Sequence, residues 1–320
     1  MARFANAELT RESLLESKLV SLLAFAPHRF YFTAVIPRKY AIAALLIGVA
    51  LISAYGQFRG GGRFRGGFQI QNDQEQKEQD DMAKALKPGF EEDTFSFARL
   101  RFGADMRYGL GRGRLWDDDT PEADLTLGYR LYQTTALKVR PGLHFIDITT
   151  NELQNYPFVY LAAAGRLDLS DDETIALRRY LNSGGFLMVD DFWGDEQWHH
   201  FYDEIKRVFP DREPVELKLD NPIFHIVFDL KKLPQIPSVG AFLSYRMSYD
   251  PGPPYAEKGH DPHYYGIYDD KQRMVVLICF NNHFGDGWEH ETDDHSYFDT
   301  FSEPQAYPMF INVAFYAMTH

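Results

Sequence analysis

The sequence predicts a doubly wound α/β domain with a mostly parallel sheet over residues 90–320, and three observations predict it. Short apolar strands alternate with amphipathic helices along this part of the chain, as they do in βαβ units. The segment FLMVDD at 186–191 is almost wholly apolar, which is typical of a strand covered on both faces. A hydrophobic fraction of 45% and an aromatic fraction of 15% supply a sizeable core. An inserted segment is expected near residues 212–270.

Hydrophobic periodicity gives the individual elements in order. Residues 94–102 (TFSFARLRF) alternate apolar and polar side chains as a half-buried strand does, and residues 123–137 have helical spacing. Ser170 and Glu173 have the spacing of a capping box, so a helix is expected to begin there and to end before the glycines at 184–185. Further strands are expected at 144–148, 158–164, 186–189, 215–219, 224–230, 264–269 and 274–280, and further helices at 195–208 and 304–320.

The N-terminal region has the layout of an export signal. Residues 41–52 (AIAALLIGVALI) carry no charge, follow Arg38 and Lys39, and precede small residues that a signal peptidase accepts, which predicts cleavage before Gln57. A retained membrane anchor is the alternative, although the run is shorter than the ~20 residues that span a bilayer. Residues 38–56 are therefore expected to be a signal peptide or membrane anchor, and both interpretations put the remainder outside the cytoplasm. Residues 1–37 form a leader to which no role is assigned.

Residues 57–89 are predicted to be a flexible linker. They begin with the glycine- and arginine-rich stretch 58–67 (FRGGGRFRGG) and continue with the wholly polar stretch 71–81 (QNDQEQKEQDD). Such composition after a cleavage site is typical of a spacer. An anionic envelope polymer is the one partner that the basic repeats suggest.

Charge and motifs exclude several classes of function. A net charge of -13 argues against nucleic-acid binding, which needs a basic surface. The single cysteine, Cys279, excludes an intramolecular disulfide and a cysteine-based zinc site, and its neighbours Ile278 and Phe280 indicate a buried hydrophobe instead of a nucleophile. The sequence has no serine nucleophile elbow, no Walker loop and no GxGxxG motif.

Ligands of doubly wound sheets bind beyond the carboxyl ends of the strands, so the polar residues after 186–189 and 274–280 are the first candidates for a site. The carboxylates of Asp190 and Asp191 could hold a divalent cation or serve as acid and base. Because adjacent side chains on an extended chain point in opposite directions, one is expected to face a cleft and the other to cap the next helix, and simple capping of loops is an equal alternative. The expected binding cleft comprises Asp190, Asp191, Trp193, Arg166, His263, Asn281, Asn282, Asp286, Trp288 and Glu289.

Two histidine-containing groups are weaker metal candidates. His260, Asp261 and His263 lie close together in the sequence, as do the residues at 290–295, but neither group has a recognised ligand spacing, so solvated histidines are favoured. No motif in the sequence predicts a cofactor. The carboxylates of Asp190 and Asp191 allow a bound divalent cation.

Residues 186–230 (FLMVDDFWGDEQWHHFYDEIKRVFPDREPVELKLDNPIFHIVFDL) resemble the bacterial domain-of-unknown-function 4159 family. Residues 95–103, 116–124, 153–186, 274–291 and 307–320 resemble the opening and close of the same family. The family's motif positions correspond here to Asp190, Asp191, Trp193, Gly194, His225, His263, Asp286, Gly287 and Trp288. The resemblance implies an extracytoplasmic protein with a flavodoxin-like or class I glutamine amidotransferase-like fold. It implies no amidotransferase activity, because the nucleophile elbow and the following His-x-Glu are missing and Phe280 stands where a histidine is expected.

A noncatalytic binding or assembly module of the cell envelope is the first functional expectation, with an envelope protein or polymer as its partner and with membrane contact through the N-terminal segment if it is uncleaved. A hydrolase that acts on envelope carbohydrate or peptide through aspartates at the strand ends is the alternative, and a purely structural partner is the third. The indoles of Trp193, Trp198 and Trp288 suit stacking on sugars, but tryptophans near helix starts are also common in cores.

Overall fold

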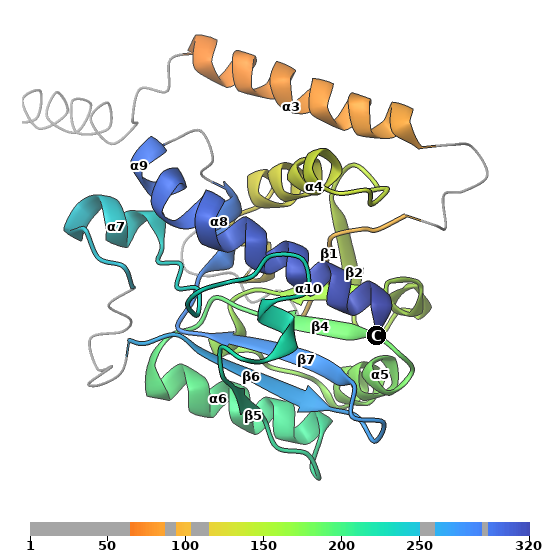
Figure 1. The fold of residues 1–320 in the computed structure, drawn as a ribbon. Coiled ribbons are helices and arrows are strands. Elements are labelled where there is room, and N and C mark those ends of the chain that lie inside the picture. The colour runs from red at the N-terminus through yellow and green to blue at the C-terminus, as the bar shows by residue number, and fades with distance from the viewer. Residues whose placement is uncertain (1–64, 87–93, 104–114, 250–259, 290–293) are drawn as a thin grey trace, which may run out of the picture. The chain divides into compact units, whose positions relative to one another are not determined.

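The computed structural model describes residues 65–86, 94–103, 115–249, 260–289 and 294–320. Within these residues, seven strands form one mixed sheet in the order β2-β1-β3-β4-β7-β6-β5 (Figure 1). Strands β2, β1, β3, β4 and β7 are parallel, whereas β6 is antiparallel to both β7 and β5. The strands are β1 (Ala98–Arg101), β2 (His144–Asp147), β3 (Phe158–Leu161), β4 (Phe186–Val189), β5 (Val215–Leu217), β6 (His263–Tyr268) and β7 (Met274–Phe280). The predicted α/β class and mostly parallel sheet are confirmed.

Helices cover both faces of the sheet (Figure 1). The helices are α3 (Arg65–Ala85), α4 (Glu122–Thr134), α5 (Asp171–Asn182), α6 (Gly194–Val208), α7 (Val239–Tyr245), α8 (Phe284–Glu289), α9 (His295–Tyr297) and α10 (Tyr307–Thr319), with a π-helix, η6 (Phe298–Ala306), before the last. Short helical turns are η2 (Leu115–Asp117), η3 (Asn151–Asn155), η4 (Ala164–Arg166) and η5 (Pro222–Phe224). Side chains of α4, α8 and α10 join one buried cluster, and those of α5 and α6 join the other, so each face of the sheet has its own core.

The N-terminus of α5 is capped by a side chain, as the sequence predicts, whereas the N-terminus of α6 is not. Ser170 and Glu173 form the predicted capping box, in which the backbone N–H of Glu173 donates to Ser170 Oγ at 3.2 Å and the Ser170 N–H donates to the Glu173 carboxylate at 2.8 Å. Helix α6 begins at Gly194 with Trp193 in the N-cap position and no side-chain cap. The expectation that an aspartate after β4 caps this helix is therefore wrong.

The segment predicted as an insertion extends the sheet at one edge, because β6 and β5 add antiparallel to β7. The strand expected at 224–230 does not form. The side-chain amide of Asn312 on α10 replaces sheet partners there: its oxygen accepts from the backbone N–H groups of Val227 and Phe228 at 2.9 and 2.8 Å, and its nitrogen donates to the Phe228 carbonyl. The buried side chain of Asn312 thus forms hydrogen bonds with backbone groups that the apolar pattern had predicted to pair with a neighbouring strand.

Part of the segment predicted as a flexible linker is helical, since α3 spans Arg65–Ala85. Its polar side chains pair at i,i+4: Gln74 donates to Glu78 and Gln76 donates to Asp80, each at 3.0 Å. Met82 is buried in the core shared with α4, which anchors the helix. Good helix formers with i,i+4 partners explain why a wholly polar stretch is ordered.

In the described part of the chain, no helix combines the length and the apolar character that crossing a membrane requires. The run at 41–52, predicted to be a signal peptide or anchor, lies outside the described residues.

Candidate functional site

Three segments that are distant in the sequence meet at the carboxyl edge of the parallel strands. Asp118 and Asp119 lie between η2 and α4, Asp191 follows β4, and His283 and Asp286 follow β7. Strands β4 and β7 are neighbours in the sheet, so the residues that follow them emerge side by side. We call these five residues the His283 cluster.

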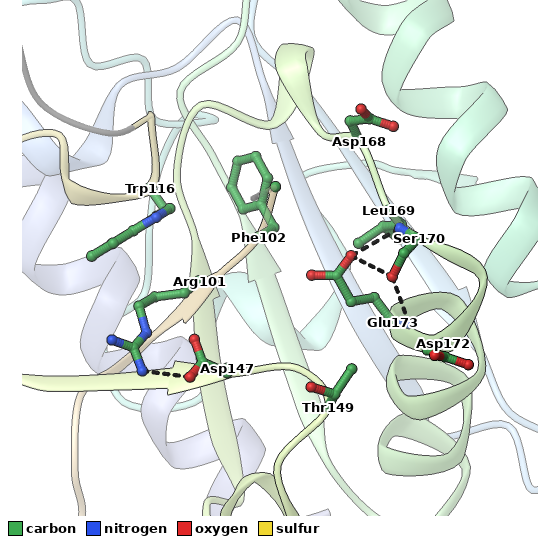
Figure 2. Close-up of a pocket in the computed structure, with 11 residues that line it drawn as sticks. Arg101, Phe102, Trp116, Asp147, Thr149, Asp168, Leu169, Ser170, Asp172 and Glu173 are labelled. Atoms are coloured by element: carbon green, nitrogen blue, oxygen red, sulfur yellow. Dashed lines mark hydrogen bonds and ion pairs between the residues drawn. The ribbon is translucent and has the colours of Figure 1, made fainter. Parts of the chain in front are cut away.

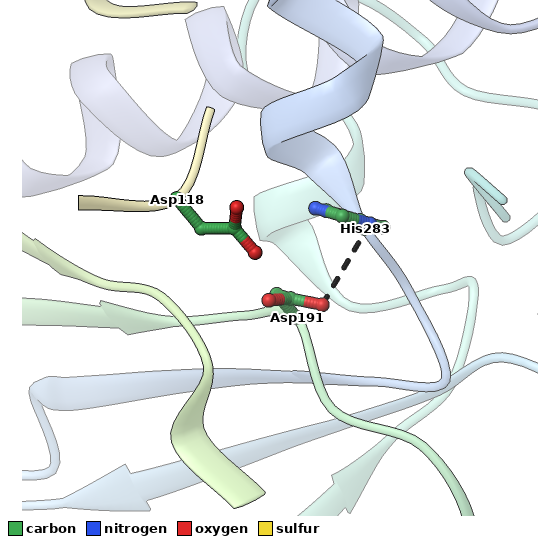
Figure 3. A group of neighbouring side chains, drawn as sticks. All are labelled: Asp118, Asp191 and His283. Atoms are coloured by element: carbon green, nitrogen blue, oxygen red, sulfur yellow. Dashed lines mark ion pairs between the residues drawn. The ribbon is translucent and has the colours of Figure 1, made fainter. Parts of the chain in front are cut away.

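The imidazole of His283 is surrounded by carboxylates. On one side of the ring, Nε2 lies 3.0 Å from Asp119 Oδ2 and 3.7 Å from Asp286 Oδ1. On the other side, Nδ1 lies 3.7 Å from Asp191 Oδ1. Asp118 lies near both Asp191 and His283 (Figure 3). Two overlapping groups, Asp118 with Asp191 and His283, and Asp119 with His283 and Asp286, each bring one ligand atom per residue within 4.8 Å of the others.

The backbone at this edge adopts conformations that side chains disfavour. Asp119, Asp191 and Asn281 have φ values of 63°, 57° and 58°, and Ala163 after β3 has 52°. Such left-handed residues cost free energy and persist where the surroundings fix them, often at functional sites. The side chain of Asn281 contributes to that fixing, since its oxygen accepts from the Gly194 N–H at 3.1 Å.

Charges in the cluster perturb one another strongly. Burial alone would lower the pKa of His283, but the carboxylates of Asp191, Asp286 and Asp119 outweigh it and raise this pKa well above its usual value. Burial opposes ionisation of Asp119, yet the charge and hydrogen bond of His283 lower its pKa to about 2. Burial raises the pKa of Asp191 to about 7, against the attraction of His283. Asp191 therefore titrates near neutral pH, while Asp119 stays ionised.

Asp190 lies beneath the cluster instead of facing a cleft. Its Oδ2 accepts from the Tyr160 hydroxyl at 2.8 Å and from the Phe284 N–H at 2.6 Å, so it ties β4 to β3 and to the start of α8. The other oxygen, Oδ1, is buried with no hydrogen-bond partner among the described residues. Burial raises the pKa of Asp190 to about 6.

A buried ion pair fixes the segment that carries Asp118 and Asp119. The Arg99 side chain on β1 donates from Nε to both carboxylate oxygens of Asp124, at 3.0 and 2.8 Å, and both side chains are 1% exposed. Arg99 Nη1 also donates to the Asp118 carbonyl at 2.7 Å. The guanidinium thus ties the segment carrying the two aspartates to β1 and α4.

Of the residues expected to form the cleft, Asp191 and Asp286 belong to the His283 cluster. Two more lie within reach of its charges. Burial and the charge of Asp119 raise the pKa of Asp118 and Glu289 adds to this rise, whereas Arg166 interacts with the charge of Asp191.

The other expected residues have structural roles or lie elsewhere. Trp193 is buried, and Trp288 is 0% exposed and packs against Phe97, Tyr160 and Phe310, so the expectation that these indoles line a cleft is wrong. Asn282 accepts from the Ile236 N–H at 3.0 Å, and Asn281 donates to the Asp261 carbonyl at 2.8 Å. His263 pairs with Glu216 on β5 at 2.8 Å.

The sequence analysis missed Asp118, Asp119 and His283. His283 follows a fully buried strand and two asparagines, which is the position where a functional residue is expected. The aspartates lie in a charged loop that follows no strand directly, so no periodic pattern marks them. Cys279 is buried on β7, as predicted, and burial raises the pKa of its thiol well above the usual value.

A protein-family model matches residues 96–318, and its description reads domain of unknown function (DUF4159). None of the curated proteins matches the sequence.

Proposed function

The chain belongs to the DUF4159 family, whose description states no activity, and we propose from its site that it is a hydrolase that uses a divalent cation held by His283, Asp191 and Asp118. The observation that carries the proposal is the orientation of the His283 ring between two sets of carboxylates.

The contact with Asp119 selects the side of the ring that would bind the cation. A metal-ligating histidine usually donates its other ring N–H to a carboxylate, which fixes the tautomer and the ring plane. Asp119 Oδ2, 3.0 Å from Nε2, is that carboxylate. With the proton on Nε2, the lone pair of Nδ1 is on the side of Asp191, to which the dashed line in Figure 3 joins it. Asp118 completes this group of possible ligands.

The distance between His283 and Asp191 and the exposure of the side chains agree with this choice. Two ligand atoms that each lie ~2.1 Å from one metal ion cannot be more than ~4.2 Å apart. The 3.7 Å between His283 Nδ1 and Asp191 Oδ1 is within that limit. Asp118 is exposed and the Asp191 side chain is 17% exposed, so water and a substrate could reach this side, whereas the side chains of Asp119 and Asp286 are nearly covered.

Three protein ligands with open positions are typical of catalytic metal sites, where the ion generates a nucleophilic hydroxide from bound water. Other residues of the protein position the ligands. Asp119 and Asp286 orient the His283 ring, and Asp190 fixes the start of α8. A cation at Nδ1 competes with a proton, because the surrounding carboxylates raise the pKa of His283, so we expect affinity to rise with pH.

We propose the same cellular setting as the sequence suggests, an extracytoplasmic place in a bacterial envelope, with envelope carbohydrate or peptide as the substrate. The strand order β2-β1-β3-β4 supports a flavodoxin-like or glutamine amidotransferase-like sheet, because flavodoxin-like sheets begin with that order.

A noncatalytic envelope-binding module is the second candidate. Exposed apolar side chains favour it, since Tyr245 and Leu243 on α7 are 69% and 46% exposed. Such side chains suit contact with a protein partner.

Calorimetric titration of the EDTA-treated full chain with Mn²⁺ at pH 8 tests the cation site. We expect saturable binding that Asp191→Asn and His283→Gln each weaken by about tenfold or more. Asp117→Asn is the control, because it removes one carboxylate next to Asp118 but belongs to neither ligand group. Equal affinities in all four proteins would refute the site.

Incubation with purified peptidoglycan tests the reaction. New reducing ends would identify carbohydrate as the substrate and new amino groups would identify peptide. We expect product with Mn²⁺ and none with EDTA or with His283→Gln. Cation binding without product from this polymer would count against the hydrolase and leave the second candidate.

A further inference from the structure

A second site candidate is a pocket of about 670 Å³ beside the first turn of α5. This volume falls within the range of small-molecule sites, ~300–1,000 Å³. Its walls come from the ends of β1 and β2, from η2, and from the residues that lead into α5 (Figure 2). The lining residues are Arg101, Phe102, Gly103, Trp116, Asp147, Thr149, Asp168, Leu169, Ser170, Asp172 and Glu173.

The pocket lies where the topology of the sheet favours a ligand. From β1 the chain continues to β2 on one side, and β3 then pairs with β1 on the other side, so the strand order reverses between β1 and β3. Open α/β sheets bind ligands outside the carboxyl ends of the strands at such a reversal.

The charge of the lining is predominantly negative. The lining contains four carboxylates, those of Asp147, Asp168, Asp172 and Glu173, and one guanidinium, that of Arg101. Arg101 is already paired with Asp147 at 2.6 Å, and Glu173 belongs to the capping box. Asp168 and Asp172 are left without a hydrogen bond to any described residue.

Apolar surface accompanies these carboxylates. Phe102, Trp116 and Leu169 line the pocket although each is largely buried. The Arg101 guanidinium lies 5.9 Å from the centre of the Trp116 ring, so this ring already faces a cation on the pocket side. An aliphatic chain could lie on this surface while its charged end meets the free carboxylates.

We propose that this pocket binds an organic cation that carries an ammonium group on a short aliphatic chain. Negative charge attracts the ammonium group, Asp168 and Asp172 accept its hydrogen bonds, and the apolar wall covers the methylenes. The proposal does not depend on hydrolysis at the His283 cluster. The two sites are adjacent in the sequence, because Trp116 lines the pocket and Asp118 belongs to the cluster.

Titration calorimetry of the full chain with cadaverine tests the proposal, with 1,5-pentanediol and glutarate as neutral and anionic probes of the same chain length. We expect saturable binding of cadaverine alone. Asp168→Asn and Asp172→Asn should each weaken binding about tenfold, because each removes a charged hydrogen-bond acceptor. Asp171→Asn is the matched control, since Asp171 lies in the same turn of α5 but pairs with Arg207 at 2.9 Å outside the pocket.

Three outcomes would overturn the proposal. The first is the absence of saturable cadaverine binding. The second is equal binding of pentanediol, which would show that charge is irrelevant. The third is an equal loss of affinity in the Asp171→Asn control, which would show attraction to the general negative charge of the chain. Circular dichroism of each variant distinguishes a lost contact from a lost fold.

Discussion

Replacement of Asp191 by asparagine should stabilise the protein at alkaline pH while removing a ligand of the proposed cation site. The carboxyl of Asp191 ionises near pH 3.8 in an unfolded chain and, because it is buried, near pH 7 in the folded one. This difference of about three pH units, at ~1.4 kcal/mol per unit, means that ionised Asp191 costs the folded state about 4 kcal/mol. Asparagine carries no charge and tolerates the left-handed backbone at this position, where φ is 57°.

The sign of the effect defines the pH window. Between about pH 4 and pH 7 the folded protein holds a proton that the unfolded chain has lost, so wild-type stability falls as pH rises through that range. The advantage of Asp191→Asn should therefore grow from about 1 kcal/mol at pH 4.5 to about 4 kcal/mol at pH 8.

Urea unfolding of both proteins at these two pH values, in EDTA, measures the difference. A variant that is no more stable than the wild type at pH 8, or whose advantage does not change with pH, would refute the inference that Asp191 is buried next to competing carboxylates.

Three further predictions concern other parts of the chain. Asp286→Ala should lower the free energy of unfolding by about 1–3 kcal/mol, because it leaves the partly buried Val239 N–H without its acceptor at 2.6 Å; an unchanged thermal midpoint would contradict this. Asp124→Asn should cost about 3–5 kcal/mol in urea unfolding, because Arg99 keeps its charge in the core, and a loss below ~1 kcal/mol would show that the pair is dispensable. Residues 1–60 fused to a reporter that works only outside the cytoplasm should give activity in a bacterial host, and an intact but inactive fusion would exclude export.

Local pattern predicted the elements of the fold better than the site. The apolar run at 274–280 and the capping box at Ser170 each gave the correct element, because both signals depend on a few neighbouring residues. The strand expected at 224–230 failed because Asn312, more than eighty residues away, bonds to that backbone. No local pattern contains that information.

The site could be predicted only in part because its chemistry depends on strand order. The sequence placed Asp191 and Asp286 after strands, and both belong to the His283 cluster. It could not show that β4 pairs with β7, nor that Arg99 ties the Asp118 segment to the domain. The tryptophans were misjudged for a related reason: Trp288 lies on the inward side of α8, and a helix of six residues is too short for periodicity to reveal its buried face.

The central place of β7 has a consequence for how the protein acquires its structure. This strand is the last along the described chain, yet it lies between β4 and β6, so the ribosome completes the middle of the sheet after both of its neighbours. Until residue 280 or so is available, β4 has an unpaired edge that can recruit other chains. Pairing across some ninety residues also slows folding, because the intervening loop must close first. Nascent chains that stall before β7 should consequently be prone to aggregation and should require chaperones.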